Sequence, residues 1–175
     1  MSALVEDLLD VAALQAGRRR IEPEPLDLAG HARAIAASWR PLFAREGVEL
    51  RCQASGEVPA LGDPVAVGRI LTNLLQNALR HGRPARDGGP SVVEVAAGPG
   101  PCFAVRDNGP GVPAAMRERL FERFVRGHPG GDGLGVGLAL SRELAVACGG
   151  SLRLVDDGAT TFVLQLPPVP AVVDA

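Results

Sequence analysis

The sequence has 175 residues, a formal net charge of −2 and 46% hydrophobic residues against 22% charged ones. This composition favours one globular domain with a buried core and excludes a largely disordered chain. A nucleic-acid partner has no electrostatic support because no long basic run is present, and no apolar run is long enough to span a bilayer. The three cysteines form no C-x-x-C pair, which argues against zinc and redox motifs and favours free thiols in a reducing cytoplasm.

The first predicted helix ends near Gly17 and has a 3–4–3 spacing of apolar residues, the a/d pattern of a coiled-coil seam. Two heptads do not form a stable helix alone, so this segment must pack against something. It is either a helix packed on the domain or the last part of a longer dimerisation helix, and the missing N-cap favours the second interpretation. The seam residues are Met1, Leu4, Leu8 and Val11.

Residues 18–27 contain two prolines and mixed charges, and they are expected to form an irregular linker. Asp27 is the expected N-cap of a helix over residues 28–47. Beyond it, helical periodicity and strand-like alternation are intermixed without βαβ regularity. This order predicts an α+β fold, a two-layer α/β sandwich whose mixed, mostly antiparallel sheet has helices on one face. The predicted strands are 48–53, 91–97, 102–107, 151–155 and 160–166, and the further helices are 64–81, 113–121 and 137–150.

The third predicted helix has Asp63 as its N-cap, Pro64 in its first turn and Gly82 as its stop. Asn73 and Asn77 lie four residues apart, on one face of this helix and beside its apolar stripe. Two amides in this position need partners, either neighbouring backbone and water or a ligand. An isolated N-x-x-x-N pair favours the first interpretation, so the choice depends on the rest of the chain. The stripe consists of Ile70, Leu71, Leu74, Leu75, Ala78 and Leu79.

Two glycine-rich stretches follow. DNGPGV, residues 107–112, comes directly after a predicted strand, where glycine permits unusual φ values and the close approach of a ligand. GDGLGVGLAL, residues 131–140, opens a helix, whose unpaired N–H groups and dipole favour a phosphate. It is neither a Walker A motif nor a Rossmann fingerprint, because no Lys-Ser/Thr follows and no βαβ unit surrounds it. FERFVRG, residues 121–127, lies between the two and by itself indicates an aromatic anchor beneath a loop.

Together and in this order, these motifs resemble the ATP-binding domain of bacterial sensor histidine kinases, within the superfamily of gyrase, Hsp90, MutL and the histidine kinases. NLLQNALRHG is similar to the N box of that family, DNGPG to its first glycine box, FERF to its F box and GLGVGLAL to its second glycine box. The resemblance implies the ATP-binding (Bergerat) fold over residues 28–168. It also implies that residues 1–17 are the end of the second dimerisation helix, 18–27 a linker and 169–175 a tail.

The resemblance implies Mg-ATP as the ligand. Asn77 would give its amide oxygen to Mg²⁺, with Asn73 assisting in the same shell. Arg80 and His81 would lie along the phosphates and ribose. Asp107 would accept a hydrogen bond from the adenine amino group and thereby select adenine over guanine. The remaining implied nucleotide contacts are Gly109, Gly111, Gly135, Gly137 and Leu138, with Arg126 and Gly133 in a lid over about 123–133.

The residue at position 73 also bears on the reaction. In the gyrase, Hsp90 and MutL relatives, and in the anti-sigma-factor serine kinases, a glutamate in the corresponding place acts as general base. Asn73 cannot take up a proton at neutral pH, so the resemblance implies a site that holds ATP without readily hydrolysing it. The acceptor in the kinases is a histidine imidazole, which is nucleophilic when neutral, so the domain would supply mainly positioning and charge neutralisation.

No histidine of this sequence suits the acceptor role. The family's phosphoacceptor lies on the first dimerisation helix, whereas His31 follows the linker, His81 belongs to the N box and His128 to the lid. The chain is therefore expected to bind ATP without phosphorylating itself, as a piece of a cytoplasmic kinase or of one anchored in the inner membrane through preceding parts. Its expected partners are the histidine-bearing helix, in a homodimer, and a response regulator.

Two other interpretations are open at this point. A non-catalytic interaction module would keep the fold and use it to bind a partner, but it would have no need to retain the N box and both glycine boxes. An ATPase or an anti-sigma-factor serine kinase is disfavoured by Asn73.

Overall fold

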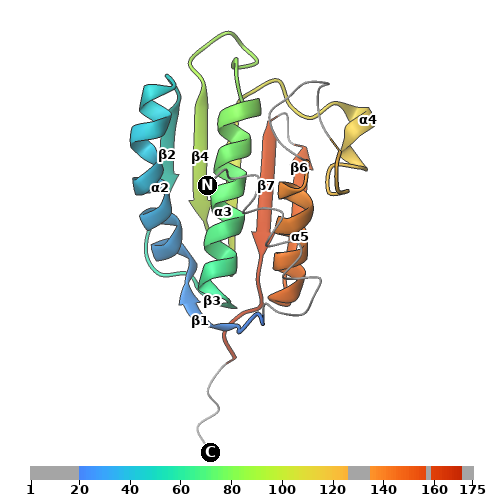
Figure 1. The fold of residues 1–175 in the computed structure, drawn as a ribbon. Helices are drawn as coiled ribbons and strands as arrows, with labels where there is room; N and C mark the ends of the chain where they lie inside the picture. Colours follow the sequence, from blue (N-terminus) through green and yellow to red (C-terminus); the bar gives the residue numbers. More distant parts are fainter. Residues whose placement is uncertain (1–19, 126–134, 157–158, 171–175) are drawn as a thin grey trace, which may run out of the picture.

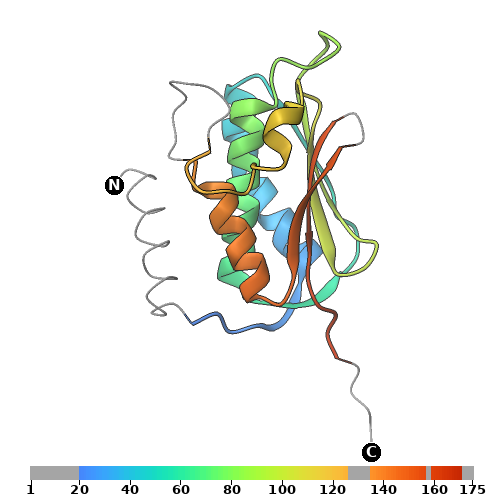
Figure 2. The ribbon, with the colours of Figure 1, turned by 90° about the vertical axis from the view of Figure 1, so that its right-hand side faces the viewer.

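The computed structural model describes residues 20–125, 135–156 and 159–170. These residues form two layers, a five-stranded sheet and three helices that cover one of its faces (Figures 1 and 2). The α+β sandwich predicted from the sequence is therefore confirmed. No helix in the described ranges is long and apolar enough to cross a membrane. The covering helices are α2 (Leu28–Arg45), α3 (Pro64–His81) and α5 (Gly137–Ala147).

The sheet is mixed and mostly antiparallel, as expected. Its strand order is β2-β4-β5-β7-β6, in which β2 runs parallel to β4 and the other three pairs are antiparallel. In the central pair, Asp107 at the end of β5 lies directly opposite Thr160 at the start of β7. This register brings the residues at positions 107 and 160 together at one end of the sheet. The strands are β2 (Glu49–Gln53), β4 (Val92–Ala97), β5 (Cys102–Asp107), β6 (Ser151–Asp156) and β7 (Thr160–Gln165).

A second, two-stranded sheet corrects the prediction of an irregular linker. Strand β1 (Glu24–Asp27) pairs antiparallel with β3 (Pro59–Gly62), which the sequence analysis did not anticipate. The linker prediction relied on Pro23 and Pro25, but proline is tolerated in edge strands, where one side of the backbone needs no partner. Both strands are four residues long and have no clear alternation of apolar and polar residues. They are recognised as strands only because they pair with each other.

The helix predicted over 113–121 is also shorter than expected. Helix α4 covers Ala114–Arg117, and the chain then continues in turns whose backbone bonds span three residues, such as Glu122 N to Arg119 O at 2.9 Å. The predicted helix over 1–17 lies outside the described residues, as does most of the predicted lid.

Helix α3 is the centre of the helical layer (Figure 1). The Oδ1 atom of Asp63 accepts hydrogen bonds from the backbone N–H groups of Val65 and Ala66, each at 2.9 Å, and Pro64 fills the first position. This confirms the predicted start, and Gly82 is the C-cap as predicted. One face of the helix is buried and includes the whole predicted stripe: Ala66, Val67, Ile70, Leu71, Leu74, Leu75, Ala78 and Leu79.

We expect Leu74→Ala to lower the free energy of unfolding by about 2–5 kcal/mol, because Leu74 is fully buried and the truncation leaves a cavity. Val65→Ala is the matched control on the same helix, since the Val65 side chain is 65% exposed, and it is expected to change stability by less than about 0.5 kcal/mol. Urea denaturation of both variants measures the difference. Equal effects of the two substitutions would show that α3 is not held by this face.

Candidate nucleotide site

The loop after β5 packs directly against the end of α3. A β-carbon on Gly82 would lie 2.8 Å from the β-carbon of Asp107, and one on Gly109 would overlap the backbone of Gly82. Glycine is therefore required at both positions for this close packing. The close approach predicted at Gly109 is thus to the protein's own backbone. Its consequence is that Asp107 lies beside the C-terminal end of α3.

Asp107 is a buried carboxylate, 6% exposed, held in a fixed orientation. Its Oδ1 atom accepts a hydrogen bond from the backbone N–H of Gly109 at 3.0 Å. The carboxylate also accepts a hydrogen bond from the side chain of Thr160. Burial raises the pKa of this carboxyl, while the two hydrogen bonds and the charge of Arg86 act in the opposite direction. A carboxylate has more acceptor positions than these two bonds use, so it retains capacity for a ligand donor.

The 107–111 loop is braced by the segment that follows α3. The backbone N–H of Arg86 donates to the carbonyl oxygen of Asn108 at 2.8 Å, and its guanidinium donates to the carbonyl of Pro110 at 3.1 Å. The Asn108 side chain accepts from Val92 N at 2.8 Å. Gly111 has a φ of +85°, which confirms that glycine here permits an unusual backbone conformation. The loop is therefore shaped by the protein before any ligand arrives.

The two asparagines of α3 have different surroundings. The amide nitrogen of Asn73 donates to Ser141 Oγ at 2.9 Å, and its Oδ1 lies where a β-carbon on Gly137 would be. The Asn77 amide makes no hydrogen bond to any residue in the described part of the chain. Asn73 is thus engaged with helix α5, while the Asn77 amide remains available to a ligand.

The start of α5 has the features of an anion site. No side chain in the described residues caps it, and the first backbone hydrogen bond of the helix is from Leu140 N to Val136 O at 2.9 Å. The N–H groups of Gly137 and Leu138 therefore lie before the first bonded amide, at the positive end of the helix dipole. Gly135 has a φ of +67°, and its carbonyl accepts from Phe124 N at 2.9 Å. These amides have the character that the predicted phosphate site would need, and the phosphate contact itself stays a prediction.

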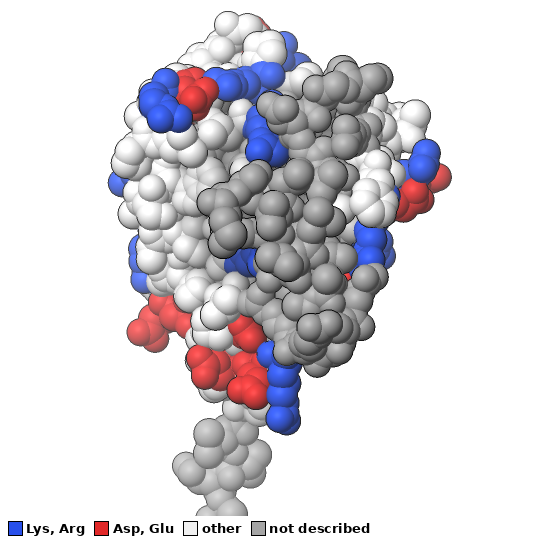
Figure 3. All heavy atoms as spheres, in the orientation of Figure 1, with Lys and Arg blue, Asp and Glu red and all other residues white. Residues whose placement is uncertain are grey.

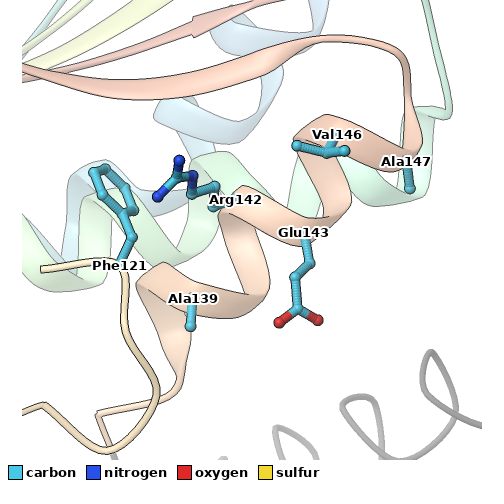
Figure 4. A pocket seen from close by; sticks show the side chains of 6 residues that line it. All are labelled: Phe121, Ala139, Arg142, Glu143, Val146 and Ala147. Atoms are coloured by element: carbon cyan, nitrogen blue, oxygen red, sulfur yellow. The ribbon is translucent and has the colours of Figure 1, made fainter. Parts of the chain in front are cut away.

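The F-box segment packs against the outer side of α5. The Phe121 ring makes an edge contact with Phe162 at 6.3 Å, and the Arg142 guanidinium lies 5.4 Å from the Phe121 ring centre. Arg123 forms an ion pair with Glu143 at 2.6 Å. Phe121 is therefore the aromatic anchor that the sequence indicated. A cavity of about 360 Å³ lies along this side of α5 (Figure 4), and none of its lining residues is a predicted nucleotide contact: Phe121, Ala139, Arg142, Glu143, Val146 and Ala147.

The structure describes only some of the remaining residues that were predicted to contact the nucleotide. Arg80 and His81 are exposed in the last turn of α3, where positive charge is favourable to the helix dipole. Arg126 and Gly133 lie outside the described residues. On the described part of the face that Figure 3 shows, arginine side chains are scattered, and acidic ones gather near β1. Among the described residues, no group of three or more His, Cys, Asp or Glu side chains is placed to hold a metal ion.

Sequence reasoning missed two hydroxyl groups of the site. Thr160 bonds Asp107 across the sheet, and only the strand register of the structure, which the sequence does not give, brings the two residues together. Ser141 lies one turn after Gly137 on α5 and is only 2% exposed. The spacing of Ser141 from Gly137 indicates only that the two residues share a helix face, so the contact with Asn73 had no signal in the sequence.

Residues 62–170 match the family model described as "Histidine kinase-, DNA gyrase B-, and HSP90-like ATPase". This match covers more than half of the chain, and it contains Asn73, Asn77, Asp107 and the start of α5. The chain belongs to this family.

Two curated relatives are sensor proteins. The chain is 36% identical over 172 residues to the swarming motility regulation sensor protein RssA of Serratia marcescens, an alignment that covers 95% of this chain and 36% of that protein. It is 34% identical over 179 residues to the signal transduction histidine-protein kinase AfsQ2 of Streptomyces coelicolor, covering 98% of this chain and 31% of that protein. The chain thus spans about a third of the length of these relatives.

Solved structures give the same fold. Full-length ShkA, crystallised in complex with AMPPNP, superposes with a TM-score of 0.74 at 29% identity, covering 97% of this chain and 36% of that chain. The mycobacterial sensor histidine kinase MprB superposes with a TM-score of 0.65 at 27% identity, covering 86% of this chain and 100% of that chain. The two-layer arrangement described above is therefore that of histidine kinase domains.

The raised pKa of Asp107 predicts a pH-dependent stability difference. Because the folded chain binds this proton more tightly than the unfolded chain, the contribution of Asp107 to stability falls as the pH rises through its folded-state pKa. Asp107→Asn does not titrate. We therefore expect this variant to be more stable than the wild type at neutral pH, with a difference that shrinks in acid, as measured by urea unfolding between pH 4 and 8.

Asp27→Asn is the control of opposite sign. The hydrogen bond from Val58 N, at 2.9 Å, is the main cause that lowers the pKa of Asp27. The stability that its carboxylate contributes is present above its ordinary pKa and is lost as the pH falls through the folded-state pKa. Asp27→Asn should therefore be less stable than the wild type at neutral pH, by a margin that stays constant down to the ordinary pKa of 3.8 and shrinks only below it, so this series extends below pH 4. A pH-independent difference for Asp107→Asn would contradict the assignment.

Proposed function

We propose that this chain is the Mg-ATP-binding catalytic portion of a sensor histidine kinase, which supplies the γ-phosphoryl group to a phosphoacceptor histidine outside this sequence. The observation that carries the proposal is the order of contacts along α3. Asn73 touches the start of α5, Gly82 touches Asp107, and Asn77 lies between them with an available amide. These contacts span nine residues, about 13 Å of helix. A nucleotide along α3 would meet an adenine contact at one end and phosphate contacts at the other.

At the adenine end, Asp107 would accept a hydrogen bond from the exocyclic amino group. Gly109 N and Thr160 hold the carboxylate in place, so it needs no reorientation when the base binds. Guanine presents a keto oxygen at this point, which would face the buried carboxylate without a hydrogen bond. Gly111 lies in the same loop. The geometry therefore supports selection of adenine over guanine.

At the phosphate end, the N–H groups at the start of α5 would bind phosphate oxygens, with Gly135, Gly137 and Leu138 contributing backbone. Arg80 and His81 are in the last turn of α3, next to Gly82 and the adenine end, so their contacts with the ribose and the phosphates stay predictions of the resemblance. Arg126 and Gly133 stay predictions, since they lie outside the described residues.

The donor set fits Mg²⁺. Asn77 would hold the ion through its amide oxygen, a hard neutral ligand, and the remaining ligands would be phosphate oxygens and water, as is usual for this ion. When bound, Mg²⁺ offsets charge on the phosphates. Asn73 cannot accept a proton, so the chain places no general base in this position. The neutral imidazole of the acceptor would attack the γ-phosphorus as the bond to the ADP oxygen breaks, and the chain contributes position and charge compensation.

The partners follow from the same proposal. A histidine-bearing dimerisation helix would present the acceptor imidazole, in a homodimer of the full kinase. A response regulator would then receive the phosphoryl group.

Calorimetric titration with a non-hydrolysable ATP analogue and Mg²⁺ tests the nucleotide site. We expect the wild-type chain to bind this analogue and to bind the corresponding GTP analogue much more weakly. Asp107→Ala should reduce affinity for the ATP analogue by about 10- to 100-fold, the range for a hydrogen bond to a charged group. No binding by a demonstrably folded chain would instead support a non-catalytic interaction module.

The same titration tests the metal ligand. Asn77→Ala should weaken binding chiefly when Mg²⁺ is present, because the lost group is an oxygen ligand of the ion rather than a base contact. Titrations in EDTA provide the comparison. Equal losses with and without Mg²⁺ would contradict the role given to Asn77.

Kinase competence needs the missing histidine. We expect the chain alone to form no acid-labile phosphoprotein from labelled ATP, and to phosphorylate a dimerisation domain of the parent kinase supplied in trans. Asn77→Ala should abolish that transfer. Steady ATP hydrolysis by the isolated chain would revive the ATPase interpretation.

A further inference from the structure

Helix α5 engages both ends of the Asn73 side chain. The amide nitrogen donates to Ser141 Oγ at 2.9 Å. The amide oxygen occupies the place that a β-carbon on residue 137 would take, so only a glycine at position 137 leaves room for this contact. Ser141 is 2% exposed. The contact therefore joins two helices through a part-buried hydrogen bond, in which the Ser141 hydroxyl is buried and the Asn73 side chain is half-buried.

The rest of the α3–α5 contact is apolar and has no directional preference. Leu74 on α3 and Leu140 and Leu144 on α5 belong to the common hydrophobic core. Apolar packing sets the separation of two helices, whereas a buried hydrogen bond also has a distance and an angle to satisfy. Breaking it leaves a buried polar group without a partner, which is costly. The Asn73–Ser141 bond is therefore the contact that fixes how far α5 is shifted or rotated against α3.

Both ends of this bond lie one helical turn from the proposed phosphate site. Ser141 is four residues after Gly137, and Asn77 is four residues after Asn73. Four residues correspond to about 6 Å along a helix. The other polar side-chain contacts of α5 within the described residues, from Arg142 and Glu143, join it to residues 121–123 and not to α3.

We propose that Ser141 is a positioning residue, which acts through Asn73 to set the distance between the phosphate-binding amides of α5 and the Asn77 amide of α3. In this assignment Asn73 is part of the joint between the helices, and its amide nitrogen takes no part in holding the nucleotide. The inference rests on the proposed nucleotide site and names a residue to which the sequence motifs give no role.

The test compares two buried hydroxyl groups, one at each end of the site. Ser141→Ala should weaken binding of the Mg-bound ATP analogue by about 5- to 30-fold while changing adenosine affinity less than twofold, because adenosine carries no phosphate. Thr160→Val, which keeps the side-chain shape, should weaken adenosine and the analogue by similar factors, because its hydroxyl holds Asp107. Calorimetry with both ligands on the three full chains gives the comparison. Thermal unfolding confirms that each variant is folded.

A double-mutant cycle tests whether Ser141 acts through Asn73. If it does, Ser141→Ala should weaken binding of the ATP analogue by a much smaller factor in an Asn73→Ala background than in the wild type. The hydrogen bond is already absent in that background. If Ser141→Ala does not fold, Ser141→Cys replaces it, because the thiol has a similar shape and is a weaker acceptor. The Cys variant should give the same pattern with smaller factors.

Three results would overturn the positioning role. They are an unchanged affinity of Ser141→Ala for the ATP analogue, equal losses for adenosine and the analogue, and the same loss in both backgrounds of the cycle. Failure of the nucleotide site itself is distinguishable, because the wild-type chain would then bind neither ligand. That outcome would remove the positioning role together with the site.

Discussion

The burial of α3 is the constraint on which the rest of the structure depends. This helix lies between α2 and α5 on the sheet, and its eight buried residues fix its rotation about its own axis (Figure 1). Once that rotation is set, Asn73 must meet α5 and Gly82 must meet Asp107. The Asp63 cap and Pro64 fix where the helix begins, and so fix the heights of both asparagines. A site built on such a helix keeps its geometry without help from flexible loops.

The Asp107 end of α3 shows what this arrangement costs in folding stability. Asp107 is buried beside the end of α3, and burial is the main cause of its raised pKa. A charge there opposes folding, and the hydrogen bonds from Gly109 N and Thr160 offset the penalty only in part. Perturbed carboxyl groups of this kind are typical of functional sites, because a core residue chosen for stability would be apolar. The position of Asp107 is therefore better explained by ligand recognition than by packing.

The sequence predicted the parts of the fold that have strong local signals. Helix α3 was predicted with its start and its stop because a cap, a proline, a long apolar stripe and a glycine all agree. Strands β1 and β3 were missed because four-residue strands have no readable period and exist through pairing between residues far apart in the sequence, as in Asp27 with Pro59 and Glu24 with Gly62. Ser141 and Thr160 were missed for a related reason. Their roles arise from contacts between distant segments, which spacing along the chain does not encode.

The two asparagines of α3 differ because of what each one meets, although their spacing is symmetric. An amide can donate and accept at once, so Asn73 bonds the Ser141 hydroxyl with its nitrogen while its oxygen packs on Gly137. A glutamate in the same place would bring a negative charge into the joint and offer acceptors alone, and Ser141 would then have to reverse its role and donate. Asparagine keeps the joint between α3 and α5 neutral and leaves the buried carboxylate of Asp107 at the other end. The residue that removes a general base is thus also the residue that aligns the two helices.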